Sequence, residues 1–206
     1  MKDRIPSRLR VALARADAGP DMMIDAAAQA LRPAEVDFVA YGEDCVLTGR
    51  TILGDLRLTD MLNDQDEYAF LDVTVERFDG GAPMAVDEVV VGRDELFLVH
   101  ATSPRGDTGS RHRTSPHHLA IKMGPYQVRG FFHSLPGTDP VAAMRRRKAM
   151  VPITNARIVY TVGEETRETR VDTLIVNREQ VDWIQAVEPD RGEFPLGPQR
   201  AAPDPA

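Results

Sequence analysis

The side chains that most often carry out chemistry are sparse in this sequence and do not stand in catalytic patterns. The chain has five histidines and one cysteine, Cys45. It contains no G-x-S-x-G nucleophile elbow, no H-E-x-x-H zinc motif, no phosphate loop and no G-x-G-x-x-G dinucleotide motif. We therefore expect no catalytic residue and no cofactor, with a small enzyme of unknown reaction as a lesser alternative.

Two groups of residues have side chains that could bind a metal ion. His112, His117 and His118 stand close together in what we expect to be a flexible linker, whereas zinc sites need three or four ligands on rigid elements. Asp60 and Asp64 are four residues apart on an expected helix and have the chemistry of an acid–base pair or a divalent-cation site. Such pairs arise by chance in a region this acidic, so we expect no metal site.

The single cysteine and the absence of long apolar segments bear on location. One cysteine excludes a disulfide within the chain and any multi-cysteine zinc or iron–sulfur site. Cys45 stands in an apolar run with no histidine near it in sequence, so we expect a small buried side chain. No stretch approaches the roughly 18 apolar residues of a membrane span, and residues 1–15 lack the apolar core of a secretory signal. We expect a cytoplasmic protein with no membrane partner.

Charge is distributed unevenly along the chain, which has 206 residues and a net charge of −7. Residues 34–103 contain 16 acidic and 4 basic residues, whereas residues 118–187 contain 7 acidic and 10 basic residues. The contrast is sharpest around two expected helices. There the first region has an acidic docking face, and the second has a basic run: Asp64, Asp66 and Glu67 form the former, and Arg145, Arg146, Arg147 and Lys148 the latter.

Opposite charges at matching places favour docking between the two regions, within one chain or head to tail between chains. We therefore predict a non-enzymatic interaction or scaffold protein that self-associates, with rings or filaments as the outcomes of head-to-tail contact. The alternative is that the basic run binds an anion, a nucleotide or a nucleic acid. Because the acidic region would repel a polyanion, nucleic acid is the less favoured partner. A run of like charge can also be only a solvated face.

The two regions also resemble each other in the order of their turns, apolar runs and threonines. Gly49 matches Gly130, residues 71–74 match residues 151–154, and residues 89–94 match residues 174–179. In this alignment Thr74 falls on Thr154. We infer a tandem duplication of a module of about 70 residues.

Each region reads mostly as β-strand, with one short helix between its second and third strands. We expect Thr59 to cap the first helix and Asp139 to cap the second, with Pro140 at its first position. Five short strands around one helix give a β-β-α-β-β-β module, which we expect to curl into a small SH3-like or Sm-like barrel. Two flatter sheets packed face to face are the competing architecture.

These patterns divide the chain into five parts. Residues 1–33 are expected to form a short helical N-terminal arm, residues 34–103 the acidic first β module, and residues 118–187 the basic second β module. Residues 104–117 are rich in Gly, Ser, Thr, Pro and Arg and are expected to be a flexible linker. Residues 188–206 contain repeated prolines and are expected to be a disordered tail.

Short motifs in both regions carry a family resemblance. Residues 57–63 read R-L-T-D-M-L-N and residues 70–74 read F-L-D-V-T, while residues 150–156 read M-V-P-I-T-N-A and residues 176–178 read V-N-R. These segments resemble an uncharacterised bacterial domain family with an R-L-S-D-x-L-N turn followed by F-[IL]-P-V-T-D-A. Residues 140–146 depart from the R-L-S-D form. The resemblance implies a fold and no activity.

Overall fold

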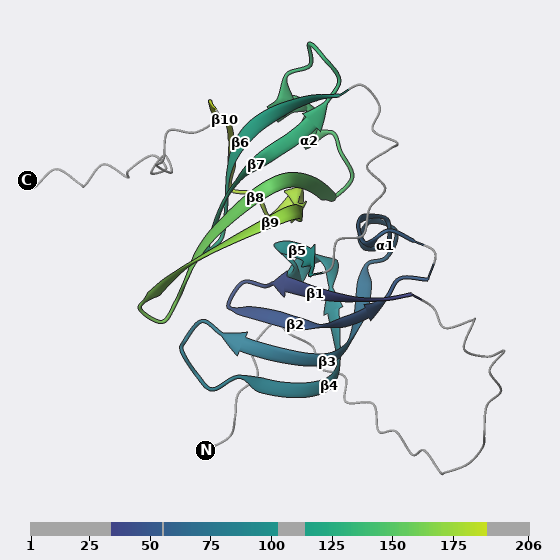
Figure 1. Ribbon diagram of the computed structural model, residues 1–206, viewed down its shortest axis with the longest axis vertical. Helices are drawn as coiled ribbons and strands as arrows, with labels where there is room; N and C mark the ends of the chain where they lie inside the picture. Colours follow the sequence, from purple (N-terminus) through teal and green to yellow (C-terminus); the bar gives the residue numbers. More distant parts are fainter. Residues whose placement is uncertain (1–33, 55, 103–113, 189–206) are drawn as a thin grey trace, which may run out of the picture.

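The computed structural model describes residues 34–54, 56–102 and 114–188 (Figure 1). The expected N-terminal arm, most of the expected linker and nearly all of the expected tail lie outside these residues. Within the described residues no helix is both long enough and apolar enough to cross a membrane.

Alternation of apolar and polar side chains gives a mainly β fold, as the sequence predicts. The first half contains β1 (Glu35–Tyr41), β2 (Cys45–Ile52), α1 (Leu58–Asp64), β3 (Glu67–Arg77), β4 (Met84–Gly92), the 3₁₀ turn η2 (Arg93–Glu95) and β5 (Leu98–Ala101). The second half contains β6 (Ser115–Met123), β7 (Tyr126–Ser134), α2 (Pro140–Arg145), β8 (Met150–Val162), β9 (Glu165–Asn177), the 3₁₀ turn η4 (Arg178–Gln180) and β10 (Trp183–Ala186). The order of elements is the same in both halves.

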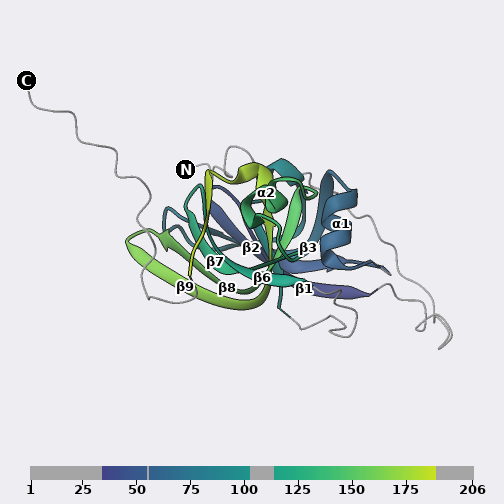
Figure 2. The same ribbon diagram turned by 90° about the horizontal axis from the view of Figure 1, so that it is seen from above.

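All ten described strands join in one antiparallel sheet, in the order β10-β6-β7-β8-β9-β5-β1-β2-β3-β4. In each half the last strand returns to pair with the first, β5 with β1 and β10 with β6. β5 also pairs with β9 and so joins the halves, while β4 and β10 lie at opposite ends of the molecule (Figure 1). Both helices lie on the same side of the strands (Figure 2).

The two helix starts differ from each other in their capping. Asp139 caps α2 as predicted: its side chain accepts a hydrogen bond from the Val141 N–H, and Pro140 is the first helical residue. The prediction for α1 is wrong, because the helix begins at Leu58 and Arg57 precedes it without a side-chain cap. Leu58 is buried against the core, and the helix begins there, one residue before the expected cap, Thr59.

The expected linker boundary at residue 117 is also wrong. β6 begins at Ser115, and Pro116, His117 and His118 pair with residues of β7. These residues form a strand because they pair with β7, although their composition is that of a linker. His117 and His118 are therefore strand residues rather than linker residues.

Glycines set the strand register in each half. Pairing shifts at Gly49 between β2 and β3, and at Gly130 between β7 and β8. A Cβ atom on Gly49 would lie 2.8 Å from the Leu71 carbonyl oxygen, and one on Gly130 would lie 2.5 Å from Ile153 Cγ2. The next strand bulges at both places, with φ of 48° at Asp72 and 48° at Asn155.

This register corrects the sequence alignment of the third strands. Gly49 and Gly130 do correspond, but Asp72 corresponds to Asn155, so Thr74 corresponds to Arg157 rather than to Thr154. The three-residue offset arises because the alignment matched threonines, whereas the glycines and the bulges opposite them determine the pairing.

Two apolar clusters form the core, and each draws residues from both halves. Met150 and Ile175 of the second half pack in the first cluster with Phe38, Leu62 and Phe70. The second cluster contains, from the first half, Tyr41, Val46 and Leu98. The halves therefore share buried side chains as well as a strand pair.

Candidate functional site

The junction between the halves is built by β5 on the edge of β9. Leu98 pairs with Val176, and Val99 pairs with Ile175. All four side chains are at most 3% exposed. A short strand thus reaches across from the first half and fills a groove in the second half.

Asn177, at the end of β9, holds the incoming strand. It is 1% exposed, and its Nδ2 donates hydrogen bonds to the carbonyls of Arg93 and Leu96, each at 2.9 Å. Its backbone N–H donates to the Phe97 carbonyl at 2.9 Å. One side chain therefore satisfies polar groups of the first half that burial removes from water.

The β6–β7 turn lines the other side of the same groove. Tyr126 Oη donates to the Gly42 carbonyl at 2.5 Å, and burial raises the pKa of this phenol well above its ordinary value. The Tyr126 ring packs against Tyr41 and Phe97, with ring centroids 5.5 and 5.8 Å apart. Gly124 leaves room for this packing, because a Cβ there would lie 2.8 Å from Phe97 Cε1.

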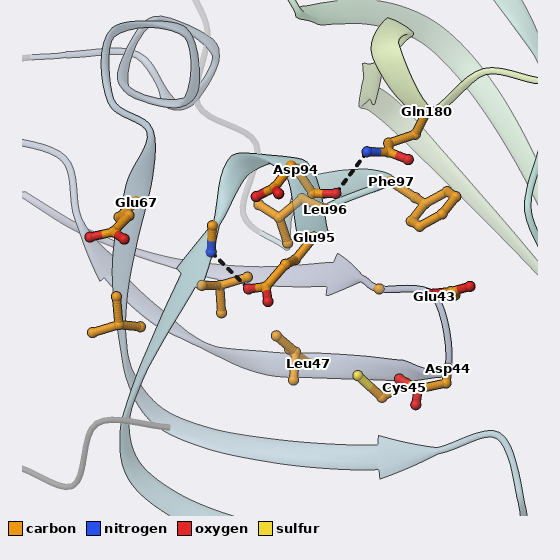
Figure 3. A pocket seen from close by; sticks show the side chains of 14 residues that line it. Glu43, Asp44, Cys45, Leu47, Glu67, Asp94, Glu95, Leu96, Phe97 and Gln180 are labelled. Carbon is orange, nitrogen blue, oxygen red and sulfur yellow. Dashed lines mark hydrogen bonds between the residues drawn. The ribbon is translucent and has the colours of Figure 1, made fainter. Parts of the chain in front are cut away.

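The corresponding positions of the first half line a cavity of about 1100 Å³ (Figure 3). Register gives the correspondence: Glu67 pairs with Gly92 where Met150 pairs with Asn177, and β5 follows η2 as β10 follows η4. We call this cavity the first-half groove. Its lining is Gly42, Glu43, Asp44, Cys45, Leu47, Glu67, Val90, Val91, Gly92, Asp94, Glu95, Leu96, Phe97 and Gln180.

The first-half groove differs from its counterpart in size and charge. Cys45 stands where the second half has Tyr126, so a large ring is replaced by a small side chain. Glu67 stands where the second half has Met150. With Glu43, Asp44, Asp94 and Glu95, five carboxylates surround the cavity (Figure 3).

The backbone at the end of β4, in the first-half groove, bonds within its own half, unlike the corresponding backbone of the second half. The Gly92 N–H donates to Glu95 Oε2 at 2.9 Å, whereas the corresponding N–H of Asn177 donates to a carbonyl of the other half. Burial, reinforced by Asp44, raises the pKa of the Cys45 thiol to about 12. A protonated, buried thiol is a poor nucleophile, so Cys45 shapes the groove rather than reacting in it.

Of the charged residues that the sequence singles out, the structure brings Lys148 and Asp64 together and gives Asp66 and Glu67 other surroundings. Lys148 Nζ lies 3.1 Å from Asp64 Oδ1, so one acidic and one basic position meet within the chain. The Asp66 carboxylate instead forms an ion pair with Arg93, in which Oδ1 lies 2.7 Å from Nη2. Glu67 lines the first-half groove.

The three arginines of the basic run are spread over the end of α2 and the turn after it. Arg147 lies over the Phe132 ring, with its guanidinium carbon 5.8 Å from the ring centroid. Arg145 is the last residue of α2, and Arg145 and Arg146 are both exposed.

Sequence reasoning missed a second cationic surface on the second half. Arg129, Arg157 and Arg170 are direct cross-strand neighbours on β7, β8 and β9. They line a cavity of about 510 Å³ together with Phe131 and His118, whose rings stack 5.0 Å apart. Glu168 bonds both Arg157 and Arg170, and these contacts lower the pKa of its carboxyl. The signal in the sequence was alternation along three strands, which shows a surface only once register is known.

Among the described residues no three His, Cys, Asp or Glu side chains are arranged to hold a metal ion. No family model, no curated protein and no solved structure matches this chain.

Proposed function

We propose that this protein is a non-enzymatic interaction or scaffold protein that self-associates head to tail. Its architecture is a tandem duplication of a small SH3-like or Sm-like module. One observation carries the proposal: the groove of the second half is filled by the first half, while the corresponding groove of the first half is a cavity. Contact within the chain is heterologous, and heterologous contacts can repeat from copy to copy.

The charges of the two halves also support contact between the second half of one copy and the first half of the next. In the chain, Asp64 is the last residue of α1 and bonds Lys148, which lies just before β8. Counting from the register of β3 and β8, Arg147 corresponds to Asp64, and Arg146 corresponds to Asn63. Inside the chain Asn63 bonds Met150 and Asp64 bonds Lys148. Between copies, transfer of these contacts would place Arg146 beside Glu67 and Arg147 beside Gln65, next to Asp66, at the start of β3. Opposite potentials of this kind steer approach and fix register.

Sedimentation velocity on the whole chain tests the proposal. We expect the weight-average mass to rise with protein concentration up to about 100 µM, a range that detects association with a free energy of about −5.5 kcal/mol or stronger. Because the groove is acidic, the rise should shrink as salt approaches about 0.5 M. A chain that stays monomeric at every concentration in low salt would contradict the proposal.

A second candidate function is anion binding, and the arginine neighbours on β7, β8 and β9 favour it. Three arginines against the carboxylates of Glu168 and Asp172 leave an excess of positive charge beside this cavity, which a bound anion would neutralise. Phe131 and His118 add a stacking surface suited to a nucleobase. The basic run that the sequence suggested for this role is partly engaged, since Lys148 bonds Asp64.

Calorimetric titration with ADP and with inorganic phosphate tests this candidate. We expect binding that Arg170→Gln weakens and that Arg145→Gln, a matched loss of charge on α2, leaves unchanged. Equal weakening by both changes would point to general charge rather than to this site.

A further inference from the structure

We propose that β10 of a second copy fills the first-half groove, with Trp183 paired to Val91 and Ile184 paired to Val90. This inference rests on the proposed self-association and names the segment that makes the contact. Repeated at each junction, the pairing would extend the sheet from one copy to the next.

The register follows from the junction inside the chain. Leu98 pairs with Tyr41 as Trp183 pairs with Lys122, so β10 stands in its half as β5 stands in the other. Val91 and Val90 stand in β4 as Val176 and Ile175 stand in β9. Transferring the observed pairs therefore gives the two proposed pairs without further assumption: Leu98 with Val176 and Val99 with Ile175 become Trp183 with Val91 and Ile184 with Val90.

The two strands required for this contact lie at the ends of the sheet. β4 and β10 are the terminal strands of the described sheet, and they lie at opposite ends of the molecule (Figure 1). A terminal strand presents backbone N–H and C=O groups that can pair with another chain. Separation of donor and acceptor strands in this way favours contact between copies over contact within one copy.

Exposure of the apolar side chains points to one of these pairs, Ile184 with Val90. Val99 and Ile175, which meet inside the chain, are 1% and 3% exposed. Ile184 and Val90, which hold the corresponding positions, are each half-buried. Docking in the proposed register would bring these two side chains together and remove both from water.

Side-chain size is also complementary. Inside the chain a large acceptor, Tyr126, shares a buried cluster with a donor of moderate size, Leu98. At the proposed junction the acceptor position holds Cys45, and the donor position holds Trp183. The smaller acceptor residue leaves space for the larger donor, as packing at constant volume requires.

The proposed junction lacks some of the hydrogen bonds that fix the junction inside the chain. Gly92 replaces Asn177, so the two bonds from the Asn177 amide have no counterpart. The Gly92 N–H must also exchange Glu95 for the Asp182 carbonyl of the second copy. The contact is therefore weaker than the junction inside the chain, and we expect reversible assembly.

A complementation experiment tests the proposal. Val90→Arg blocks the groove and leaves β10 intact, whereas Ile184→Arg blocks β10 and leaves the groove intact. We expect each variant alone to be monomeric by sedimentation velocity, and an equimolar mixture to form a complex of two chains and no larger species. Ala85→Arg on β4 and Ala186→Arg on β10 add the same charge outside the proposed pairs and should assemble as the wild type does. Circular dichroism melts check that each variant is folded.

Cross-linking provides a second measurement that does not depend on the folding of a charged variant. In a Cys45→Ala background, a Val90→Cys chain mixed with an Ile184→Cys chain should form a disulfide dimer under mild oxidation, and a Met84→Cys chain should not. Wild-type assembly without this cross-link or complementation would overturn the β10 register and leave the proposed function standing. A monomeric wild type would overturn both.

Discussion

Asn177 shows how much of the junction depends on single residues. Its amide reaches two carbonyls of the other half, and its backbone reaches a third. Nothing near Asn177 in sequence identifies these partners, because they lie 80 or more residues away. The sequence shows the asparagine only as part of the V-N-R segment of the family resemblance, which does not indicate its role.

Asn177→Ala should lower the free energy of unfolding by about 1–3 kcal/mol, because two buried carbonyls lose their donor. Gln180→Ala is the matched control, since this half-buried side chain makes one solvent-exposed bond across the same junction, to the Asp94 carbonyl. Urea denaturation of both variants measures the difference. Equal, small effects would show that the Asn177 amide is not the principal tie between the halves.

The Cys45 thiol should resist alkylation near neutral pH. Its pKa of about 12 leaves it almost fully protonated there, and the side chain is buried. Reaction with iodoacetamide should be slow in the folded protein, should speed up steeply in urea, and should be followed by mass spectrometry. Labelling as fast as that of a free thiol would contradict the burial of Cys45.

At the scale of elements, the sequence predicted composition and order better than pairing. The mainly β character, the two short helices and the Asp139 cap follow from local patterns, and the structure has all three. The offset of the third strand did not follow, because Gly49 and Gly130 act through contacts on a neighbouring strand. The β5–β9 pair was equally hidden, since it joins residues of different halves.

Gly130→Ala should destabilise the second half by about 1–3 kcal/mol, because the new methyl group would overlap with its neighbours on β8. The added Cβ would lie 2.5 Å from Ile153 Cγ2 and 3.0 Å from the Thr154 carbonyl oxygen. Gly81→Ala is the control, since a Cβ there would meet a side-chain oxygen of Asp79 at 3.2 Å and no other atom within 4 Å. Thermal melts that do not separate the two variants would show that the bulge is not set by this glycine.

At the scale of the whole molecule, the two halves differ mainly in the side chains that line their grooves and in whether the groove is occupied within the chain. The second half has an aromatic, amide-lined groove that is filled within the chain. The first half has an acidic groove, and the second half has basic residues after α2. A permanent joint inside the chain and a charged surface at each end are what a reversible head-to-tail scaffold requires.

Charge reversal tests that arrangement at the flank of the junction. Arg146→Glu with Arg147→Glu should weaken self-association, because transfer of the contacts inside the chain places Arg146 beside Glu67, and Arg147 beside Gln65 and next to Asp66, of the next copy. Each exposed pair contributes only about 0.2–1 kcal/mol, so we expect a several-fold to roughly hundredfold loss of affinity that shrinks in salt. Adding Asp66→Lys and Glu67→Lys in the same chain should restore part of the affinity, whereas Arg145→Glu with Arg170→Glu changes the charge equally and should act less. Sedimentation velocity on these variants measures the effect, and loss of assembly without rescue would mean that the arginines act through their own half rather than across the junction.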